Sequence, residues 1–129
     1  MHFLTEKVAR ILFALPFGVF SFFHFVRSME MTHVVPSWLP GAIFWVYFTG
    51  LAMLAACICI ATKMFVTEAC LGLTLLLIIF VVTVHIPGLS HERTAQMAMA
   101  GLLKDVALAG GALALAGIYY RKEGFRLLA

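Results

Sequence analysis

Four polar side chains that could bind a ligand interrupt long apolar stretches of this chain: His24, His85, Lys104 and Asp105. An imidazole can hydrogen-bond the polar head of a ligand, and an ammonium or a carboxylate group supplies a fixed charge. Charged side chains deep in an apolar membrane segment are costly, and those that occur usually face inward and find partners. These residue types therefore indicate a binding site enclosed by apolar elements.

Sequence motifs of the common catalytic and metal sites are absent. No spacing among the histidines and carboxylates resembles a metal-ligand pattern. The glycine pair Gly110-Gly111 lies inside an apolar run, where it cannot form a phosphate-binding loop. The three cysteines also lie in apolar runs without a CxxC pair, and we expect them to be packing residues. We therefore predict no metal and no covalently bound cofactor, and the sequence favours a chain that is not an enzyme on its own.

The elements that must position these side chains are four apolar runs, residues 8–26, 42–61, 65–85 and 95–120. Each run has about the 20 residues that a helix needs to cross the hydrocarbon of a membrane. Hydrophobic residues make up 64% of the chain and charged residues 12%, whereas soluble domains are roughly half apolar and about a quarter charged. We predict an all-α fold, a single domain over residues 1–129 that forms an integral membrane, antiparallel four-helix bundle. The first run is expected to be a retained span rather than a cleaved signal peptide.

Prolines mark where the regular helices are expected to end. After the third run, Pro87 and Gly88 are expected to stop the helix at His85. Two prolines in the loop 27–41 preclude a regular helix or a strand ladder. We expect an ordered turn or a partly extended segment there.

The distribution of basic residues predicts the orientation in the membrane. Six lie on one side, in the N-terminal segment, the turn after the second run and the C-terminal tail: Lys7, Arg10, Lys63, Arg121, Lys122 and Arg126. At most three lie on the other side: Arg27, Arg93 and Lys104. Because positive residues concentrate on the cytoplasmic side, both termini are predicted to be cytoplasmic, with the bacterial inner (plasma) membrane as the predicted location. No basic run exceeds two residues, so nucleic acid is excluded as a partner.

This topology brings the polar side chains to one level of the bilayer. The first and third runs point outward and the fourth points inward, so the four side chains all lie toward the outer end. Ser21 is three residues from His24 and shares its helical face. Trp38, in the outer loop, is expected to anchor at the headgroup level, with a roof over the pocket as the alternative. The predicted outer-side ligand pocket is lined by Ser21, His24, Trp38, His85, Lys104 and Asp105.

The depth of Lys104 and Asp105 has two interpretations. If the last helix starts near Ala95, both charges lie about 15 Å along it, buried and paired. Alternatively, residues 95–103 form a separate interfacial helix, which places the charges at headgroup level but leaves a short span. The sequence favours the buried arrangement. Adjacent helical residues point about 100° apart, so we expect that the two charges do not neutralise each other along one face.

Three stretches of the chain carry a family resemblance: residues 10–25, residues 35–50 and residues 103–113. The most specific of them is the turn Pro36-Ser37-Trp38-Leu39-Pro40-Gly41. In these stretches the chain resembles the DoxX-like family of small four-span bacterial membrane proteins. The resemblance implies a four-helix membrane bundle, and the family takes its name from a subunit associated with quinone-linked sulfur oxidation. Many members place a glutamate where this chain has Met53, so the resemblance assigns no catalytic residue here.

Three functional hypotheses follow from these features. The first is a membrane protein that binds a hydrophobic ligand, a quinone or a lipid, in the outer-side pocket or serves as an accessory subunit. The second is a subunit of a quinone-linked oxidoreductase, which requires a partner that carries the redox cofactor. The third is a structural or assembly protein that uses the small residues of the last run to contact a membrane protein partner or a second copy of itself. All three imply membrane lipids as neighbours.

Overall fold

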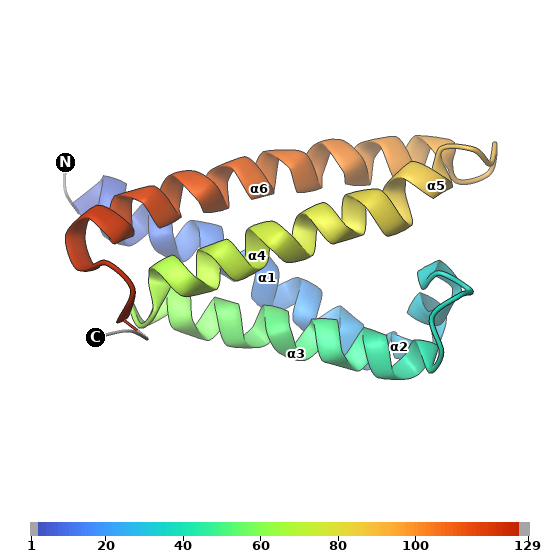
Figure 1. Cartoon of the computed structure of the whole chain (residues 1–129), viewed down its shortest axis with the longest axis horizontal. Helices are drawn as coiled ribbons and strands as arrows, with labels where there is room; N and C mark the ends of the chain where they lie inside the picture. Colours follow the sequence, from blue (N-terminus) through green and yellow to red (C-terminus); the bar gives the residue numbers. More distant parts are fainter. Residues whose placement is uncertain (1–2, 127–129) are drawn as a thin grey trace.

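Helices make up nearly all of the computed structural model, which describes residues 3–126 (Figure 1). Four helical stretches are long and apolar enough to cross a membrane: Phe3–Val26, Ala42–Ala61, Val66–Gly88 and Ala95–Glu123. No strand occurs among the described residues. The predicted all-α four-helix bundle is therefore confirmed, and the chain is a small membrane protein. The predicted domain bounds, 1–129, reach beyond the described residues at both ends.

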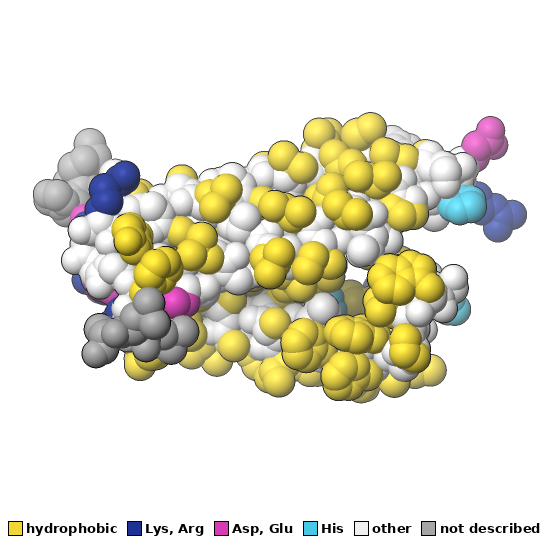
Figure 2. All heavy atoms as spheres, viewed as in Figure 1, with side chains coloured by type: hydrophobic (Ala, Val, Ile, Leu, Met, Phe, Trp, Pro, Cys, Tyr) yellow, Lys and Arg dark blue, Asp and Glu magenta, His cyan; other side chains and the backbone are white. Residues whose placement is uncertain are grey.

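The surface has the distribution of polarity that a bilayer requires. Hydrophobic side chains cover the body of the visible face, and charged side chains gather at its two ends (Figure 2). Large apolar residues are exposed on every span, among them Leu12, Leu51, Leu75 and Leu113. In a bundle of this size such side chains face lipid, because there is too little protein to cover them.

The first span and the outer loop are more helical than predicted. A π-helical turn, η1 (Phe3–Val8), precedes α1 (Ala9–Val26). The loop then begins with the short helix α2 (Ser28–Met31) and the 3₁₀ turn η2 (Thr32–Val34). The ordered turn or partly extended segment expected over residues 27–41 is thus confined to its second half, where the Leu39 N–H donates to the Pro36 carbonyl at 3.0 Å. The change comes at Val35, whose backbone is extended because the following proline disfavours the helical conformation.

The third span continues past the point where it was predicted to stop. It consists of α4 (Val66–Phe80), the π-helical turn η3 (Val81–His85) and α5 (Ile86–Gly88). A proline ring clashes with the carbonyl four residues before it and has no N–H to offer. The π turn accommodates this, because the Ile86 N–H donates to the Val81 carbonyl, five residues back. Pro87 then occupies the first turn of α5, where a proline is tolerated.

The four spans form two closely packed pairs. The first span, α1, lies along α3 (Ala42–Ala61), and α4 lies along α6 (Ala95–Glu123). The short turn between α3 and α4 joins the pairs at one end, and the pairs diverge toward the other end (Figure 1). The core fills the joined end with buried side chains from all four spans: Ala14, Phe17, Ile60, Leu73, Ala112, Ala116 and Tyr119.

Arg10 links α1 to α3 at the joined end of the bundle. Its guanidinium Nη1 donates to the carbonyls of Ile60 and Ala61, both at 2.9 Å, and the residue is 7% exposed. These carbonyls are among the last of α3, where the helix itself supplies few donors, and the Ile60 carbonyl also accepts from the Lys63 N–H at 3.3 Å. A cation at this position also interacts favourably with the helix dipole. Arg10 was assigned above only to membrane orientation, and it also ties α1 to the end of α3.

Candidate functional site

A cavity of about 620 Å³ lies between the diverging helix pairs, next to the loop 27–41. Its walls come from α1, the loop, α3, α4 with η3, and α6, and most of the lining side chains are apolar. The molecule is visibly hollowed between the two pairs at this end (Figure 2). The cavity therefore occupies the space that the core fills at the opposite end of the bundle.

The mouth of the cavity opens sideways between α3 and α4. Phe48 on α3 and Ile79 on α4 both line the cavity, and they are 52% and 44% exposed on the surface of the molecule. Trp38, 72% exposed, lines the cavity from the loop. Because α3 and α4 are membrane spans, an opening between them faces lipid. This position for Trp38 is compatible with both the anchor and the roof that were expected for it.

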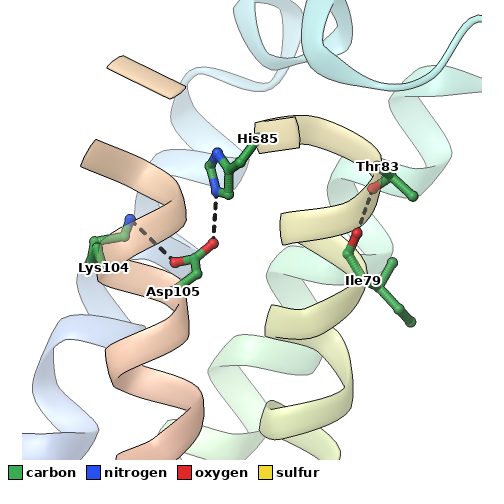
Figure 3. Close-up of polar contacts among 5 residues, drawn as sticks. All are labelled: Ile79, Thr83, His85, Lys104 and Asp105. Atoms are coloured by element: carbon green, nitrogen blue, oxygen red, sulfur yellow. Dashed lines mark hydrogen bonds and ion pairs between the residues drawn. The ribbon is translucent and has the colours of Figure 1, made fainter. Parts of the chain in front are cut away.

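A polar cluster lies in the wall formed by η3 and α6. The Nε2–H of His85 donates to Oδ2 of Asp105 at 2.7 Å, and Lys104 Nζ lies 3.6 Å from Oδ1 of the same carboxylate (Figure 3). Asp105 is 3% exposed, so its two partners offset the cost of removing the carboxylate from solvent. The buried and paired arrangement favoured by the sequence is thus confirmed for Asp105, because α6 is one continuous helix from Ala95.

Lys104 differs from its prediction. Its side chain is 48% exposed, and its ammonium lies both beside Asp105 and 4.3 Å from the centre of the Phe20 ring. The long aliphatic stem lets the ammonium turn back toward its neighbour, although the two Cα–Cβ bonds point apart. The two residues lie on different faces of α6, as expected, but the ammonium still comes within 3.6 Å of the Asp105 carboxylate, so the two charges are paired.

Gly101 makes room for the imidazole of His85. A Cβ atom at this position would lie 2.5 Å from His85 Cε1 and 2.8 Å from Nδ1, so only a glycine lets the ring lie against α6. Sequence analysis did not assign this role to Gly101. The signal was present, since Gly101 precedes Asp105 by four residues and residues at that spacing share a helical face.

His24 lies on the opposite wall of the same cavity. Its Nδ1 donates to the Phe20 carbonyl at 2.7 Å, and its ring stacks on Phe80 with the ring centres 6.4 Å apart. Gly50 permits the close approach of α1 and α3 here, because a Cβ there would lie 2.7 Å from the His24 Cβ. His24, which lies on α1, therefore also contacts α3 and α4.

Ser21 is not among the residues that line the cavity. It is 1% exposed and its hydroxyl donates to the Gly50 carbonyl at 2.8 Å, which joins α1 to α3. The shared face with His24 was inferred correctly, but this part of the face packs against a neighbouring backbone. The assignment of Ser21 as a ligand contact is therefore corrected to a helix-packing role.

Two threonines and one methionine that sequence analysis did not assign also line the cavity. The Thr49 hydroxyl donates to carbonyls of its own helix, at 2.9 Å to Trp45 and 3.1 Å to Val46. The Thr83 hydroxyl does the same toward Ile79 at 2.7 Å. Both are polar interruptions of an apolar run, which is the signal by which the other site residues were found. Met53, the position of the glutamate in the DoxX-like pattern, also lines the cavity.

The charged and histidine residues of the outer loops remain outside the site. They are exposed, and none lines the cavity: Glu30, His33, His91 and Glu92. Within residues 3–126, no three His, Cys, Asp or Glu side chains come close enough together to hold a metal ion.

Comparison with known proteins gives one match. Residues 13–116 match the family described as a domain of unknown function, DUF8561. The chain belongs to the DUF8561 family. No curated protein and no solved structure matches the chain. The matched segment of this DUF8561 protein includes every residue that lines the cavity, from Phe20 to Asp105.

The arrangement in this DUF8561 protein can accommodate an elongated apolar molecule with a small polar head. Most of the cavity wall offers apolar contact, while His24, His85 and Asp105 offer hydrogen-bonding atoms at the inner wall and Thr49 and Thr83 add a hydroxyl each. The mouth between α3 and α4 gives such a molecule a direct path from the bilayer. The resemblance to the DoxX-like family remains a prediction beside the established DUF8561 membership.

Proposed function

We propose that this DUF8561 protein binds a hydrophobic small molecule, a quinone or a lipid, that enters from the bilayer. The observation that carries the proposal is the cavity of about 620 Å³, which has apolar walls, a lateral mouth and a cluster of polar side chains inside. Ligand pockets of roughly 300–1,000 Å³ with apolar walls and a few convergent polar groups are typical small-molecule sites. The DoxX-like resemblance is compatible with this proposal, and we retain it as a hypothesis.

The proposed location is the bacterial inner membrane, with the cavity toward the outer leaflet. The bias of basic residues toward the joined end supports this orientation, and Lys63 and Arg121 lie at that end. A molecule that partitions into the outer leaflet then reaches the mouth between α3 and α4 without crossing the membrane.

A subunit of a quinone-linked oxidoreductase is the second candidate function. The hydrogen-bonded pair of His85 and Asp105 favours it, because a histidine beside a buried carboxylate in a ligand cavity can hold a proton next to a bound molecule. Electron transfer then requires a partner protein with its own redox centre. A role in assembly alone is less favoured, because such a role does not account for the presence of the cavity.

Purification in lipid nanodiscs followed by mass spectrometry of the extracted molecules tests the proposal. The matched variants are Leu76→Trp and Leu75→Trp, neighbours on α4: Leu76 lines the cavity, whereas Leu75 is 62% exposed on the outer surface. We expect a molecule that co-purifies with the native chain and with Leu75→Trp, and that is lost from Leu76→Trp because the indole fills its space. Thermal unfolding confirms that both variants are folded. The same lipid profile in all three proteins would refute the proposal.

A further inference from the structure

Hydrogen-bond acceptors dominate the polar atoms that face the cavity. The hydroxyl protons of Thr49 and Thr83 are already donated to carbonyls of their own helices. A hydroxyl that has donated its proton keeps its oxygen lone pairs for accepting. Both residues therefore offer a ligand an acceptor.

His24 adds a third acceptor. A carbonyl oxygen cannot donate, so the contact between His24 Nδ1 and the Phe20 carbonyl requires the proton on Nδ1. In a neutral imidazole the other nitrogen, Nε2, then carries a lone pair. Nε2 is at the far end of the ring from the backbone, and the ring is fixed in direction by Phe80.

Two aromatic N–H donors near the cavity already have acceptors. His85 Nε2–H donates to Asp105, and the indole N–H of Trp45 donates to the Pro40 carbonyl at 3.0 Å. The ammonium of Lys104 lies 3.6 Å from Asp105 Oδ1 and 4.3 Å from the centre of the Phe20 ring, and at least one of its three N–H groups can still donate. Trp38 can still donate, but it lies at the exposed rim.

The fixed charges in the cavity wall cancel. Among the described residues that line it, Lys104 and Asp105 carry the fixed charges, one of each sign, 3.6 Å apart. An anionic head near the cluster meets the Asp105 carboxylate, and a cationic head meets Lys104. A second charge placed in this low-dielectric wall has no counter-charge left to pair with.

We infer that the bound molecule is an uncharged amphiphile whose head carries a hydroxyl group, and that His24 Nε2 accepts the hydrogen bond from this hydroxyl. The inference rests on the proposed function and narrows it. It selects an alcohol or phenol head, as in a long-chain alcohol or a quinol, over a fatty acid, a phospholipid or an oxidised quinone. An oxidised quinone presents only carbonyl acceptors, which cannot pair with His24 Nε2 or with the hydroxyl oxygens of Thr49 and Thr83.

Tryptophan fluorescence gives a direct measurement. The two tryptophans of the chain, Trp38 and Trp45, both line the cavity, so a brominated ligand inside it quenches them. The probes are a brominated long-chain primary alcohol, the fatty acid with the same chain, and its methyl ester, each added to protein in nanodiscs. Competition with the unbrominated alcohol separates saturable quenching in the cavity from quenching by probe in the surrounding lipid.

We expect the alcohol to bind about fivefold more tightly than the methyl ester, as one net hydrogen bond predicts, and more tightly than the acid. His24→Phe keeps the aromatic contact with Phe80 but loses Nε2, so it should bind the alcohol and the methyl ester about equally tightly. His33→Phe, the same change at an exposed histidine outside the cavity, should keep the preference for the alcohol. Thr49→Val removes another acceptor from the cavity wall, and Thr62→Val is the same change at an exposed threonine. Comparing the preference for the alcohol in these two variants does not depend on the folding of His24→Phe.

The outcomes separate the inference from the function on which it rests. If no probe quenches saturably, the proposed function fails. If the probes bind saturably but the acid or the ester binds as tightly as the alcohol, the inference fails and the function stands. A preference for the alcohol that survives in His24→Phe would assign the recognition to another group and would refute the role of His24.

Discussion

Replacing Gly101 by alanine tests how the polar cluster is assembled. The added Cβ would lie 2.5 Å from His85 Cε1, whereas carbon atoms in contact are about 3.5–4.0 Å apart, so the ring must move by about 1 Å or more. That displacement breaks the 2.7 Å hydrogen bond between His85 and Asp105. The carboxylate then keeps only Lys104, whose side chain is 48% exposed.

The expected loss of stability combines two opposing effects. Weakening one partner of a buried carboxylate costs about 1–3 kcal/mol, the range for hydrogen bonds to charged groups and for buried groups left unsatisfied. Alanine in place of glycine in a helix contributes about 0.5–1 kcal/mol in the other direction. We therefore expect Gly101→Ala to lower the free energy of unfolding by up to about 2 kcal/mol.

Gly110→Ala is the matched control on the same helix. Beyond its two chain neighbours and the backbone of its own helical turns, a Cβ at Gly110 would meet no described atom within 4 Å, so this substitution should be neutral or slightly stabilising. Unfolding in mixed micelles, followed by circular dichroism, measures both variants. In a His85→Ala background, Gly101→Ala should behave like Gly110→Ala, because the ring that it displaces is gone. Equal stabilities of the two alanine variants in the native background would refute the assignment.

Two further predictions concern the ends of the bundle. Arg10→Met should lower the free energy of unfolding by about 2–3 kcal/mol, because two carbonyls of α3 lose a charged donor. Arg27→Met, at a side chain 63% exposed, should change it little. The same unfolding titration measures both variants, and equal effects would contradict the capping role of Arg10. Cross-linking Phe48→Cys to Ile79→Cys with a short cleavable thiol reagent, in a chain whose native cysteines are replaced, should close the mouth and stop uptake of the brominated alcohol. Cleavage of the reagent should restore uptake, and unchanged uptake by the cross-linked protein would mean that the ligand enters elsewhere.

The sequence predicted the spans and the burial of Asp105 because both depend on local composition. Apolar runs of membrane length define the helices, and a carboxylate inside such a run requires partners, as Asp105 shows. The sequence did not predict the third span past His85, because the π turn depends on how Pro87 is accommodated by residues before it. Such a turn changes the direction of the side chain at its end, which is where His85 meets Asp105.

The assignments that failed depend on packing between helices. Ser21 and His24 share a face of α1, yet the Ser21 hydroxyl contacts the backbone of α3 whereas the His24 ring borders the cavity. The difference depends on Gly50, which brings the two backbones together beside both residues. No spacing within the first run contains that information. The same applies to Gly101, whose role is visible only when η3 is placed against α6.

The cavity itself argues for an occupant. A sealed void costs about 24 cal/mol per Å³, so about 620 Å³ of empty space would cost on the order of 15 kcal/mol, as much as the whole stability of a typical domain. The mouth between α3 and α4 removes this cost by admitting hydrocarbon from the bilayer. A plain lipid chain, however, would place hydrocarbon against His24 Nε2 and the hydroxyl oxygens of Thr49 and Thr83, and would leave these acceptors without a partner. A molecule with a hydrogen-bonding head would contact both the polar and the apolar parts of the wall, which is why we propose a specific ligand rather than bulk lipid.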